Sequence, residues 1–337
     1  MSNILIMGAG GFGTALAVMS RKCGHKITMW SPFPEEVEML CRDREHKKLL
    51  AGIPIPADVE ITTSLEALGG AELVILAVPS AAVRSTAATL AKSVPERIPV
   101  ACVSKGLEAG TYKILSDVME EELPRNPIVM ISGPSHAEEV ARGYPTTVVA
   151  ASRSRAAAET VQDLLMNETF RIYVSDDVVG VEYGGALKNI IALAAGILDG
   201  LGSGDNTKAA LMTRGIAEIA RLGVAMGAKA ETFAGLSGIG DLIVTCASMH
   251  SRNRRCGILI GEGVEPAEAV ARIGMTVEGY PCTKVAYELA RQQKIYMPIV
   301  EQAYHVLYEG KDIAAATKDL MERPKRHESE TIWLLTR

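Results

Sequence analysis

The sequence lacks any pair of cysteines at the C-x-x-C spacing. Its cysteines are scattered singly, a distribution typical of reduced thiols in a cytosolic protein rather than of a disulfide framework or a zinc site. No H-x-x-x-H pattern offers metal ligands, and no G-x-S-x-G pattern marks an acyl nucleophile. We therefore expect a cytoplasmic protein that binds no metal. The cysteines are Cys23, Cys41, Cys102, Cys246, Cys256 and Cys282.

Positive charge and long apolar runs are also scarce. The chain has 337 residues, with 35 Lys and Arg against 40 Asp and Glu, so its formal net charge is -5. This balance argues against general binding to nucleic acid or an anionic membrane, but it permits a local cationic pocket for a small anion. The apolar run 4–7 is too short for a signal peptide, and the stretch near 190–198 falls well short of the ~20 residues of a membrane-spanning helix. We expect no integral membrane contact.

The first half of the chain alternates short β-type runs with helical segments. This alternation predicts a doubly wound α/β sheet. Strands that are aliphatic on both faces predict a parallel sheet covered by helices. The expected strands are 3–7, 26–30, 72–78, 100–104, 128–132, 146–151 and 171–175. The expected helices between them are 12–23, 34–42, 81–92, 111–122, 135–142 and 154–166.

After about residue 180 the strand signals stop, and segments rich in Ala, Leu and Ile follow. We expect an α/β domain over residues 1–180 and an all-helical domain over residues 181–337. No polar linker separates them, so the first helix of the second half lies at the junction, where ligand sites are favoured. The expected helices are 181–199, 206–227, 252–261, 266–272, 281–292, 298–309 and 312–320.

A glycine-rich motif follows the first expected strand directly and opens the first expected helix. Strand, G-x-G-x-x-G and helix together predict a Rossmann-like dinucleotide-binding domain. Gly8 permits a tight turn, and Gly10 lets the backbone approach a pyrophosphate. Gly13 allows the helix to pack closely on the strand, with its N-terminus aimed at the phosphates.

The acid expected at the end of the second strand, which would bind a ribose 2′-hydroxyl, is missing. Trp30, Ser31 and Pro32 stand there instead. Without a carboxylate the 2′-phosphate of NADP is not repelled. No arginine stands at that position to attract it, although Arg42 or Arg44 could reach it. We expect NADP or NAD as cofactor, with NADP or dual use favoured.

The segment 180–200 predicts a buried helix that carries one cation, Lys188. Small neighbours at helical spacing would let another backbone or a substrate lie against the ammonium group. Partial burial would lower the pKa of this lysine and make it a usable proton donor or acceptor near neutral pH. Alternatively, Lys188 reaches past the domain edge or pairs with Glu182 or Asp199. Its neighbours on the helix are Gly184, Gly185, Ile191, Ala192 and Ala195.

Four other stretches carry polar groups that suit a small anionic ligand. Lys105 follows a strand at the carboxyl edge of the expected sheet, where ligands of α/β proteins bind; it could equally lie in solvent. Ser135 stands at a strand-to-helix corner and could bind an anion or simply cap the helix. The loop 235–241 is expected to present Asp241 between two helices. Three arginines in the segment 250–255 could grip a phosphate or form a solvated turn.

Taken together, these stretches resemble the bacterial type of NAD(P)-dependent glycerol-3-phosphate dehydrogenase. The motifs cover the chain from residue 4 to about 310, in the order of that family. They are GAGGFGTALA (8–17), AVPS (77–80), SKGLE (104–108), ISGPSHAEEV (131–140), EYGGALKNIIALAAGI (182–197), LSGIGDLIVTC (236–246), SRNRRCG (251–257) and MTVEG (275–279).

The resemblance implies a role for each matching residue. Lys188 would be the catalytic lysine, exchanging a proton with the C2 oxygen of sn-glycerol 3-phosphate or dihydroxyacetone phosphate. The substrate would contact Lys105, Gly133, Ser135, Lys188, Asp241, Ser251, Arg252 and Asn253. The cofactor would contact Gly8, Gly10, Gly11, Phe12, Gly13, Lys105, Ala137, Arg252 and Glu278. Phe12 stands where many members carry Trp or Tyr, and Ser31–Phe33 where members often carry Arg or His.

The resemblance further implies reduction of dihydroxyacetone phosphate for phospholipid synthesis. We also expect a homodimer. One rival is a dehydrogenase of the 6-phosphogluconate or β-hydroxyacid type, which pairs similar domains and also uses a lysine on the junction helix. Another is a non-catalytic protein that senses NAD(P)H. Lys188, Lys105 and Asp241 argue against a sensor, because binding alone requires no proton transfer.

Overall fold

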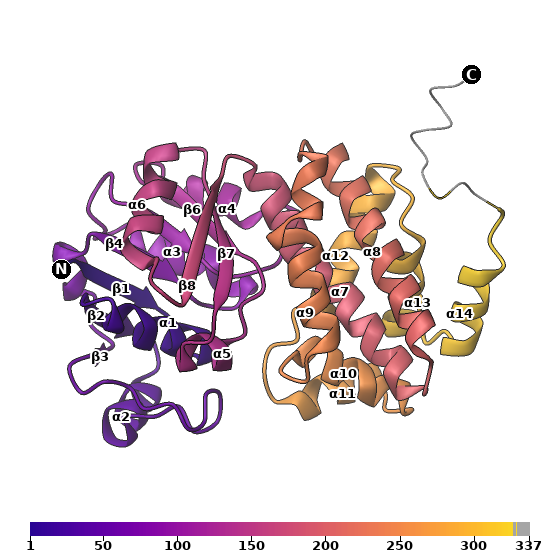
Figure 1. Cartoon of the computed structure of the whole chain (residues 1–337), viewed down its shortest axis with the longest axis horizontal. Coiled ribbons are helices and arrows are strands. Elements are labelled where there is room, and N and C mark those ends of the chain that lie inside the picture. Colours follow the sequence, from indigo (N-terminus) through magenta and orange to yellow (C-terminus); the bar gives the residue numbers. More distant parts are fainter. Residues whose placement is uncertain (326–327, 329–337) are drawn as a thin grey trace.

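The structure of the chain, a computed structural model, describes residues 1–325 and residue 328. Figure 1 shows the strands together in the N-terminal part, drawn indigo to magenta, and the orange and yellow helices beside them. The last strand ends at Ser175 and the first helix of the second part begins at Val178. The range expected for the helical domain extends to residue 337, and its positions 326–327 and 329–337 lie outside the described residues.

The N-terminal part is built around one eight-stranded sheet with the order β3-β2-β1-β4-β5-β6-β7-β8. Alternate residues of β1 point to opposite faces, with Ile4 and Ile6 in one core and Leu5 and Met7 in another. The strands are β1 (Asn3–Met7), β2 (Lys26–Trp30), β3 (Glu60–Thr62), β4 (Leu73–Leu76), β5 (Val100–Cys102), β6 (Ile128–Ser132), β7 (Thr146–Ala151) and β8 (Phe170–Ser175).

Helices cover both faces of this sheet, as the doubly wound pattern predicts. Buried residues of α1, α5 and α6 share the core of Ile4 and Ile6, whereas those of α3 and α4 share the core of Leu5 and Met7. The helices are α1 (Gly11–Lys22), α2 (Pro34–Asp43), α3 (Val83–Leu90), α4 (Leu115–Glu122), α5 (Ala137–Arg142) and α6 (Arg155–Leu165).

The sheet is mostly parallel, as expected, and departs from parallel pairing at one boundary. β6 and β7 pair antiparallel, and β8 pairs parallel to β7, so these last two strands run opposite to the others. α5, between β6 and β7, has only six residues and spans about 9 Å, too short to carry the chain back along a strand. β8 also departs from the expected two-sided burial: Phe170 and Ile172 are buried, whereas Arg171, Tyr173 and Val174 are exposed.

Two elements, β3 and α4, differ from the sequence prediction for local reasons. β3 was not expected, because only three residues pair there and Ile61 is their sole aliphatic side chain. The helix expected over 111–122 begins at Leu115, since the preceding residues form a turn closed by a bridge between Leu107 and Ile114. Ser135 does not cap α5; its hydroxyl donates to the carbonyl of Gly133 at 2.9 Å instead.

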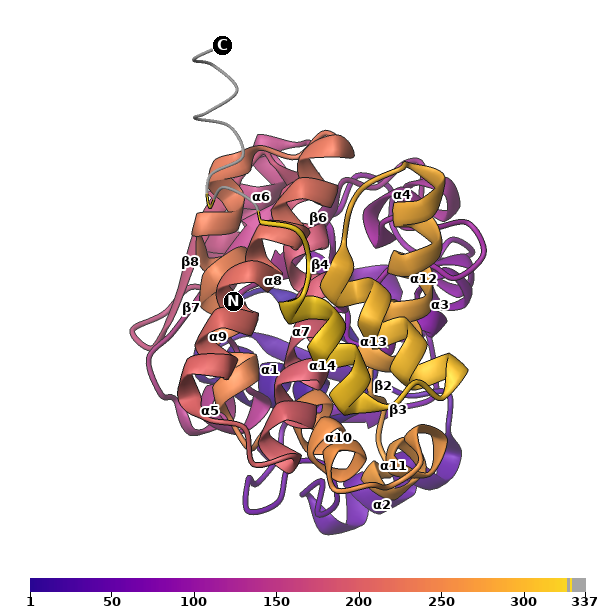
Figure 2. The same cartoon turned by 90° about the vertical axis from the view of Figure 1, so that its right-hand side faces the viewer.

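The C-terminal part is helical, as expected. Figure 2, viewed from that side, shows the orange and yellow helices in front of the sheet. The expected ranges include every long helix but omit α9. The helices are α7 (Val178–Gly200), α8 (Asp205–Ala225), α9 (Asp241–Ala247), α10 (Arg252–Gly261), α11 (Pro266–Ile273), α12 (Gly279–Gln292), α13 (Pro298–Glu309) and α14 (Ile313–Met321).

α7 is the central helix of this part and packs against α8, α9, α10 and α12. It has 23 residues, and it is the one helix in the described ranges long and apolar enough by composition to cross a membrane. Within the structure 89% of its apolar window is buried. The stretch expected at 190–198 is therefore part of a longer apolar helix that packs inside the protein.

Candidate active site

Lys188 lies on α7 with only 6% of its surface exposed. Its Nζ donates to a carboxylate oxygen of Asp241 and to the hydroxyl of Thr245, the latter at 2.7 Å. The alternative pairings expected for Lys188 are wrong. Glu182 accepts hydrogen bonds from Ser116, and Asp199 pairs with two other cations, Lys208 and Arg254.

A second lysine reaches the same carboxylate from the other part of the chain. Lys105 follows β5, and its Nζ lies 2.7 Å from the second oxygen of Asp241 and 2.9 Å from the carbonyl oxygen of Gly133. Asp241 is 1% exposed, so two ammonium groups bind one buried carboxylate. The cluster as a whole has an excess of one positive charge, which suits an anionic ligand.

The electrostatics of this cluster favour proton transfer at Lys188. Burial lowers the pKa of Lys188 to about 8, although the Asp241 carboxylate opposes that shift; the nearby Lys105 charge adds to it. Burial alone would raise the pKa of Asp241, but Lys105 and Lys188 outweigh it and hold that pKa below its usual value. Asp241 therefore stays ionised while Lys188 titrates close to neutral pH.

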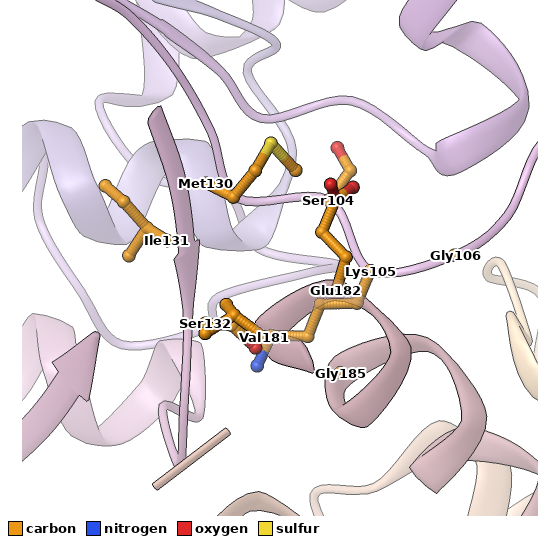
Figure 3. Close-up of a pocket in the computed structure, with 9 residues that line it drawn as sticks. All are labelled: Ser104, Lys105, Gly106, Met130, Ile131, Ser132, Val181, Glu182 and Gly185. Carbon is orange, nitrogen blue, oxygen red and sulfur yellow. The ribbon is translucent and has the colours of Figure 1, made fainter. Parts of the chain in front are cut away.

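The small residues beside Lys188 serve two different contacts. A side chain at Gly184 would lie 2.4 Å from the carbonyl oxygen of Ser237, so the loop before α9 packs on this point of α7. One at Gly185 would lie 2.7 Å from the hydroxyl of Ser132 and 3.6 Å from Lys105. Figure 3 shows Lys105 and Ser132 around a small cavity beside Gly185.

Thr245 was not anticipated as part of the site. It lies four residues after Asp241 on α9, and its hydroxyl donates to the carbonyl of Asp241 at 2.6 Å while accepting from Lys188. The four-residue spacing was visible in the sequence once α9 was assumed. His136 was also missed. Its Nε2 is buried and has no hydrogen-bond partner among the described residues, and burial followed by the charge of Lys188 lowers the pKa of its imidazole.

The segment 251–253 lies at the start of α10. Ser251 accepts from the backbone of Arg254 at 3.2 Å and thus caps the helix. Asn253 donates to Asn189 at 2.9 Å and accepts from the Gly279 backbone at 2.8 Å, which ties α10 to α7 and α12. Arg252 is exposed, and within residues 1–325 it makes no ion pair. Its guanidinium is therefore available to bind an anion.

Glu278 joins the two parts of the chain beside the carboxyl edge of the sheet. Its carboxylate accepts from the backbone and the hydroxyl of Ser80, at 3.0 and 2.6 Å. Ser80 belongs to the AVPS segment after β4, and a side chain at Gly106 would lie 2.6 Å from it. Segments from β4, β5 and the start of α12 therefore meet at this point.

The glycine loop has the geometry that a dinucleotide requires. Gly8 has φ of +117° and donates to the carbonyl of Trp30 at 2.8 Å, and a side chain at Gly13 would lie 2.0 Å from the carbonyl of Gly8. A side chain at Gly10 would meet nothing closer than Leu49, at 3.9 Å, so the loop is open on that side. No acid stands in the first turn of α1, whose N-terminus favours an anion. The residues present fit a bound dinucleotide.

Both parts of the chain match known protein families. Residues 3–158 match the family described as NAD-dependent glycerol-3-phosphate dehydrogenase N-terminus, and residues 177–318 match the corresponding C-terminus. The chain belongs to the NAD-dependent glycerol-3-phosphate dehydrogenase family. The family therefore covers both the strand-containing part and the helical part.

Individual members of this family are similar over almost their whole length. A glycerol-3-phosphate dehydrogenase [NAD(P)+] from Desulfitobacterium hafniense is 52% identical over 99% of this chain and 95% of that protein. One from Moorella thermoacetica is 54% identical over 98% of both. The crystal structure of glycerol-3-phosphate dehydrogenase from Coxiella burnetii superposes with a TM-score of 0.92 at 38% identity, covering 96% of this chain and 99% of that one.

Among the described residues no group of three or more His, Cys, Asp or Glu side chains could hold a metal ion. The six cysteines are free thiols. The charged groups at the junction of the two parts are therefore lysine, arginine and carboxylate side chains, which can bind an anion and move a proton.

Proposed function

We propose that this chain catalyses the reversible NAD(P)-dependent reduction of dihydroxyacetone phosphate to sn-glycerol 3-phosphate. Membership of the glycerol-3-phosphate dehydrogenase family supports the reaction class. The observation that carries the proposal is the buried Lys188, bound to Asp241 and with a pKa of about 8, between the two parts of the chain. Such a lysine is mostly protonated at pH 7, so it can donate a proton, and it becomes neutral at slightly higher pH, where it can accept one.

The bound nicotinamide would supply or accept the hydride at C2 of the substrate. In the reductive direction, Lys188 donates a proton from Nζ to the C2 oxygen, so that the carbonyl becomes a hydroxyl group. Its ammonium charge also stabilises the negative charge that develops on this oxygen. In the oxidative direction, neutral Lys188 accepts that proton. Asp241 and Thr245 hold Nζ in place by their hydrogen bonds.

We assign the other residues by their positions around Lys188. Lys105 and Arg252 supply positive charge for the substrate phosphate, since Arg252 is otherwise unpaired in the described chain. Gly133, Ser135, Ser251 and Asn253 form the polar wall of the substrate site. The glycine loop, including Gly11 and Phe12, together with Ala137 and Glu278 forms the cofactor side. These roles agree with the hydrogen bonds that join the two parts at Asp241 and Glu278.

The test is oxidation of NADH and of NADPH, measured separately, with dihydroxyacetone phosphate as acceptor. Turnover with either cofactor supports the reaction. Turnover only with 6-phosphogluconate or a β-hydroxyacid, in the oxidative direction, would favour that rival class. Tight cofactor binding without turnover on any of these substrates would favour a sensor of NAD(P)H.

We further infer that the protein is a cytoplasmic homodimer that feeds phospholipid synthesis. The free thiols support a reducing compartment. Exposed apolar side chains on the helical part, such as Val224 and Ile243, support a surface between subunits. Light scattering coupled to gel filtration tests the dimer: a solution mass of one chain would contradict it, and twice that mass would support it.

A further inference from the structure

The carboxylate that the end of β2 lacks is supplied from α2. Ser31, at the end of β2, is fully buried, and its hydroxyl donates to Glu36 at 2.5 Å. Glu36 lies in the first turn of α2 with a quarter of its side chain exposed. A carboxylate therefore lies beside the position where an acid would bind the ribose 2′-hydroxyl.

Two connections place this carboxylate beside the glycine loop. Along the sheet, the backbone of Gly8 donates to the carbonyl of Trp30, the residue before Ser31. On the other side, the His46 imidazole lies 3.6 Å from Glu36, and the backbone of His46 accepts hydrogen bonds from Leu49 and Leu50. Leu49 in turn packs against the glycine loop, since a side chain at Gly11 would lie 2.8 Å from its carbonyl oxygen.

The hydrogen bonds of Ser31 leave no donor for a phosphate. Its hydroxyl proton is committed to Glu36, while its oxygen accepts from the backbone of Phe33 at 3.2 Å. The imidazole of His46, together with Ser31, holds the pKa of Glu36 below its usual value despite partial burial. Glu36 is thus a charged acceptor at neutral pH, with lone pairs that a hydroxyl can use.

The arginines that could attract a 2′-phosphate are engaged elsewhere. Arg44 donates to the carbonyls of Pro56 and Val59, and Arg42 pairs with Asp43. Lys47 binds the same Asp43 at 3.0 Å. Lys48 is exposed and makes no ion pair in the described chain. Of the cations in the segment 42–48, it is the one that could still attract a 2′-phosphate.

We propose that Glu36, positioned by Ser31 and His46, makes this enzyme prefer NAD(H) over NADP(H). The carboxylate accepts a hydrogen bond from the ribose 2′-hydroxyl and repels a 2′-phosphate at the same place. This preference differs from the NADP or dual use that the sequence favours, where the acid at the end of β2 is missing. The inference rests on the proposed function only in that the glycine loop binds a dinucleotide.

The test is direct titration of the full-length protein with NADH and with NADPH, following nicotinamide fluorescence or heat. We expect NADPH to bind at least about tenfold more weakly than NADH, a difference of about 1.4 kcal/mol. Glu36→Gln keeps the size of the side chain and removes its charge, so the ratio of the two Kd values should fall by about tenfold. Glu35→Gln, which removes the neighbouring exposed acid of α2, should leave the ratio unchanged.

The salt dependence of the wild-type protein provides a second measurement that needs no variant. If a carboxylate repels the 2′-phosphate, the ratio of the NADPH to the NADH Kd falls as salt rises, because screening weakens the repulsion. If Lys48 attracts the phosphate instead, the ratio rises with salt. The pyrophosphate that both cofactors share cancels from this ratio.

Equal Kd values in the wild-type protein, tighter binding of NADPH, or a ratio unaffected by Glu36→Gln would overturn the inference. None of these results would contradict the proposed reaction, because turnover of dihydroxyacetone phosphate tests that reaction separately. Conversely, a preference for NADH that depends on Glu36 but without turnover would sustain the inference and contradict the proposed reaction. Absence of binding of either cofactor would overturn both.

Discussion

At the scale of single residues, Lys188 illustrates how burial creates a reactive group. Burial of an ammonium group disfavours its charged form, and the Asp241 carboxylate only partly compensates. A more exposed lysine would remain protonated at neutral pH and could not accept a proton. A lysine without Asp241 would lose its orientation as well as its charge partner.

Replacement of Lys188 by Ala tests its proposed role directly. We expect Lys188→Ala to lose turnover by roughly 10²- to 10⁴-fold, the usual contribution of a positioned acid or base. Binding of NADH should persist, because the glycine loop lies on the other part of the chain. Lys284→Ala, at an exposed position of α12, is the matched control. Near-normal turnover of Lys188→Ala would refute the assignment.

The pH dependence of oxidation tests the pairing of Lys188 with Asp241. Oxidation requires neutral Lys188, so kcat/KM for sn-glycerol 3-phosphate should rise with pH through about 8. Asp241 raises the pKa of Lys188, so in Asp241→Asn the inflection should move to lower pH. The exposed Asp205→Asn should leave it in place. An unchanged inflection in Asp241→Asn would mean that another group controls the profile.

At the scale of secondary-structure elements, the helical part is held by contacts that only the folded structure reveals. α7 and α10 approach closely along glycines: a side chain at Gly257 would lie 2.1 Å from the carbonyl of Leu193. Glu218 of α8, which is 3% exposed, accepts hydrogen bonds from Ile299 and Val300 at the start of α13. One helix thus supplies an acceptor for the unpaired N–H groups of another.

Glu218 makes stability depend on pH in a defined direction. Burial raises the pKa of Glu218 from 4.5 to about 7. Between about pH 4.5 and pH 7 the folded state therefore binds more protons than the unfolded state. Stability from this group is present below pH 4.5 and is lost as pH rises toward 7, by on the order of 3 kcal/mol. In Glu218→Gln this part of the pH dependence should vanish, as measured by denaturant unfolding at several pH values.

Glu218→Ala separates the hydrogen bonds from the charge. Gln retains a carbonyl acceptor, whereas Ala leaves buried N–H groups of α13 without a partner, which should cost about 1–3 kcal/mol. Equal stability of the Ala and Gln variants at pH 5 would contradict this account. So would a Gln variant that keeps the pH dependence of the wild-type protein.

At the scale of the whole molecule, polar contacts between side chains join the two parts at the carboxyl edge of the sheet. Lys105 meets Asp241, Ser80 meets Glu278, and Ser116 meets Glu182. The first two belong to the proposed site. The third lies behind it, where Glu182 of α7 accepts from the backbone of Ser116 at 3.1 Å and from its hydroxyl.

Ser116→Ala should weaken this third contact more at high pH than at low pH. Burial raises the pKa of Glu182 to about 7, and the Ser116 hydroxyl opposes that rise by binding the carboxylate. Loss of the hydroxyl should destabilise the fold by about 1–3 kcal/mol at pH 8, where the carboxylate is ionised. At pH 5 the group is protonated and the loss should be smaller. Equal losses at both pH values would contradict the assignment.

The sequence alone predicted most of the strands and helices, with β3 and α9 as exceptions, and it supplied the candidate site residues. Runs such as Ile4–Met7 followed by glycines, and the apolar periodicity after residue 180, depend on neighbours within a few positions along the chain. Local sterics and spacing therefore sufficed for the long strands, the long helices and the glycine loop. The motifs likewise identified Lys188, Lys105 and Asp241 as members of one site.

Only the tertiary structure decided how those groups are paired. The Lys188–Asp241–Lys105 contact joins residues of α7, of α9 and of the segment after β5, which lie far apart along the chain. Their geometry follows from packing between distant elements, which also sets the burial of each charge. Since burial controls pKa, the chemistry of Lys188 is a property of the fold as much as of its residue type.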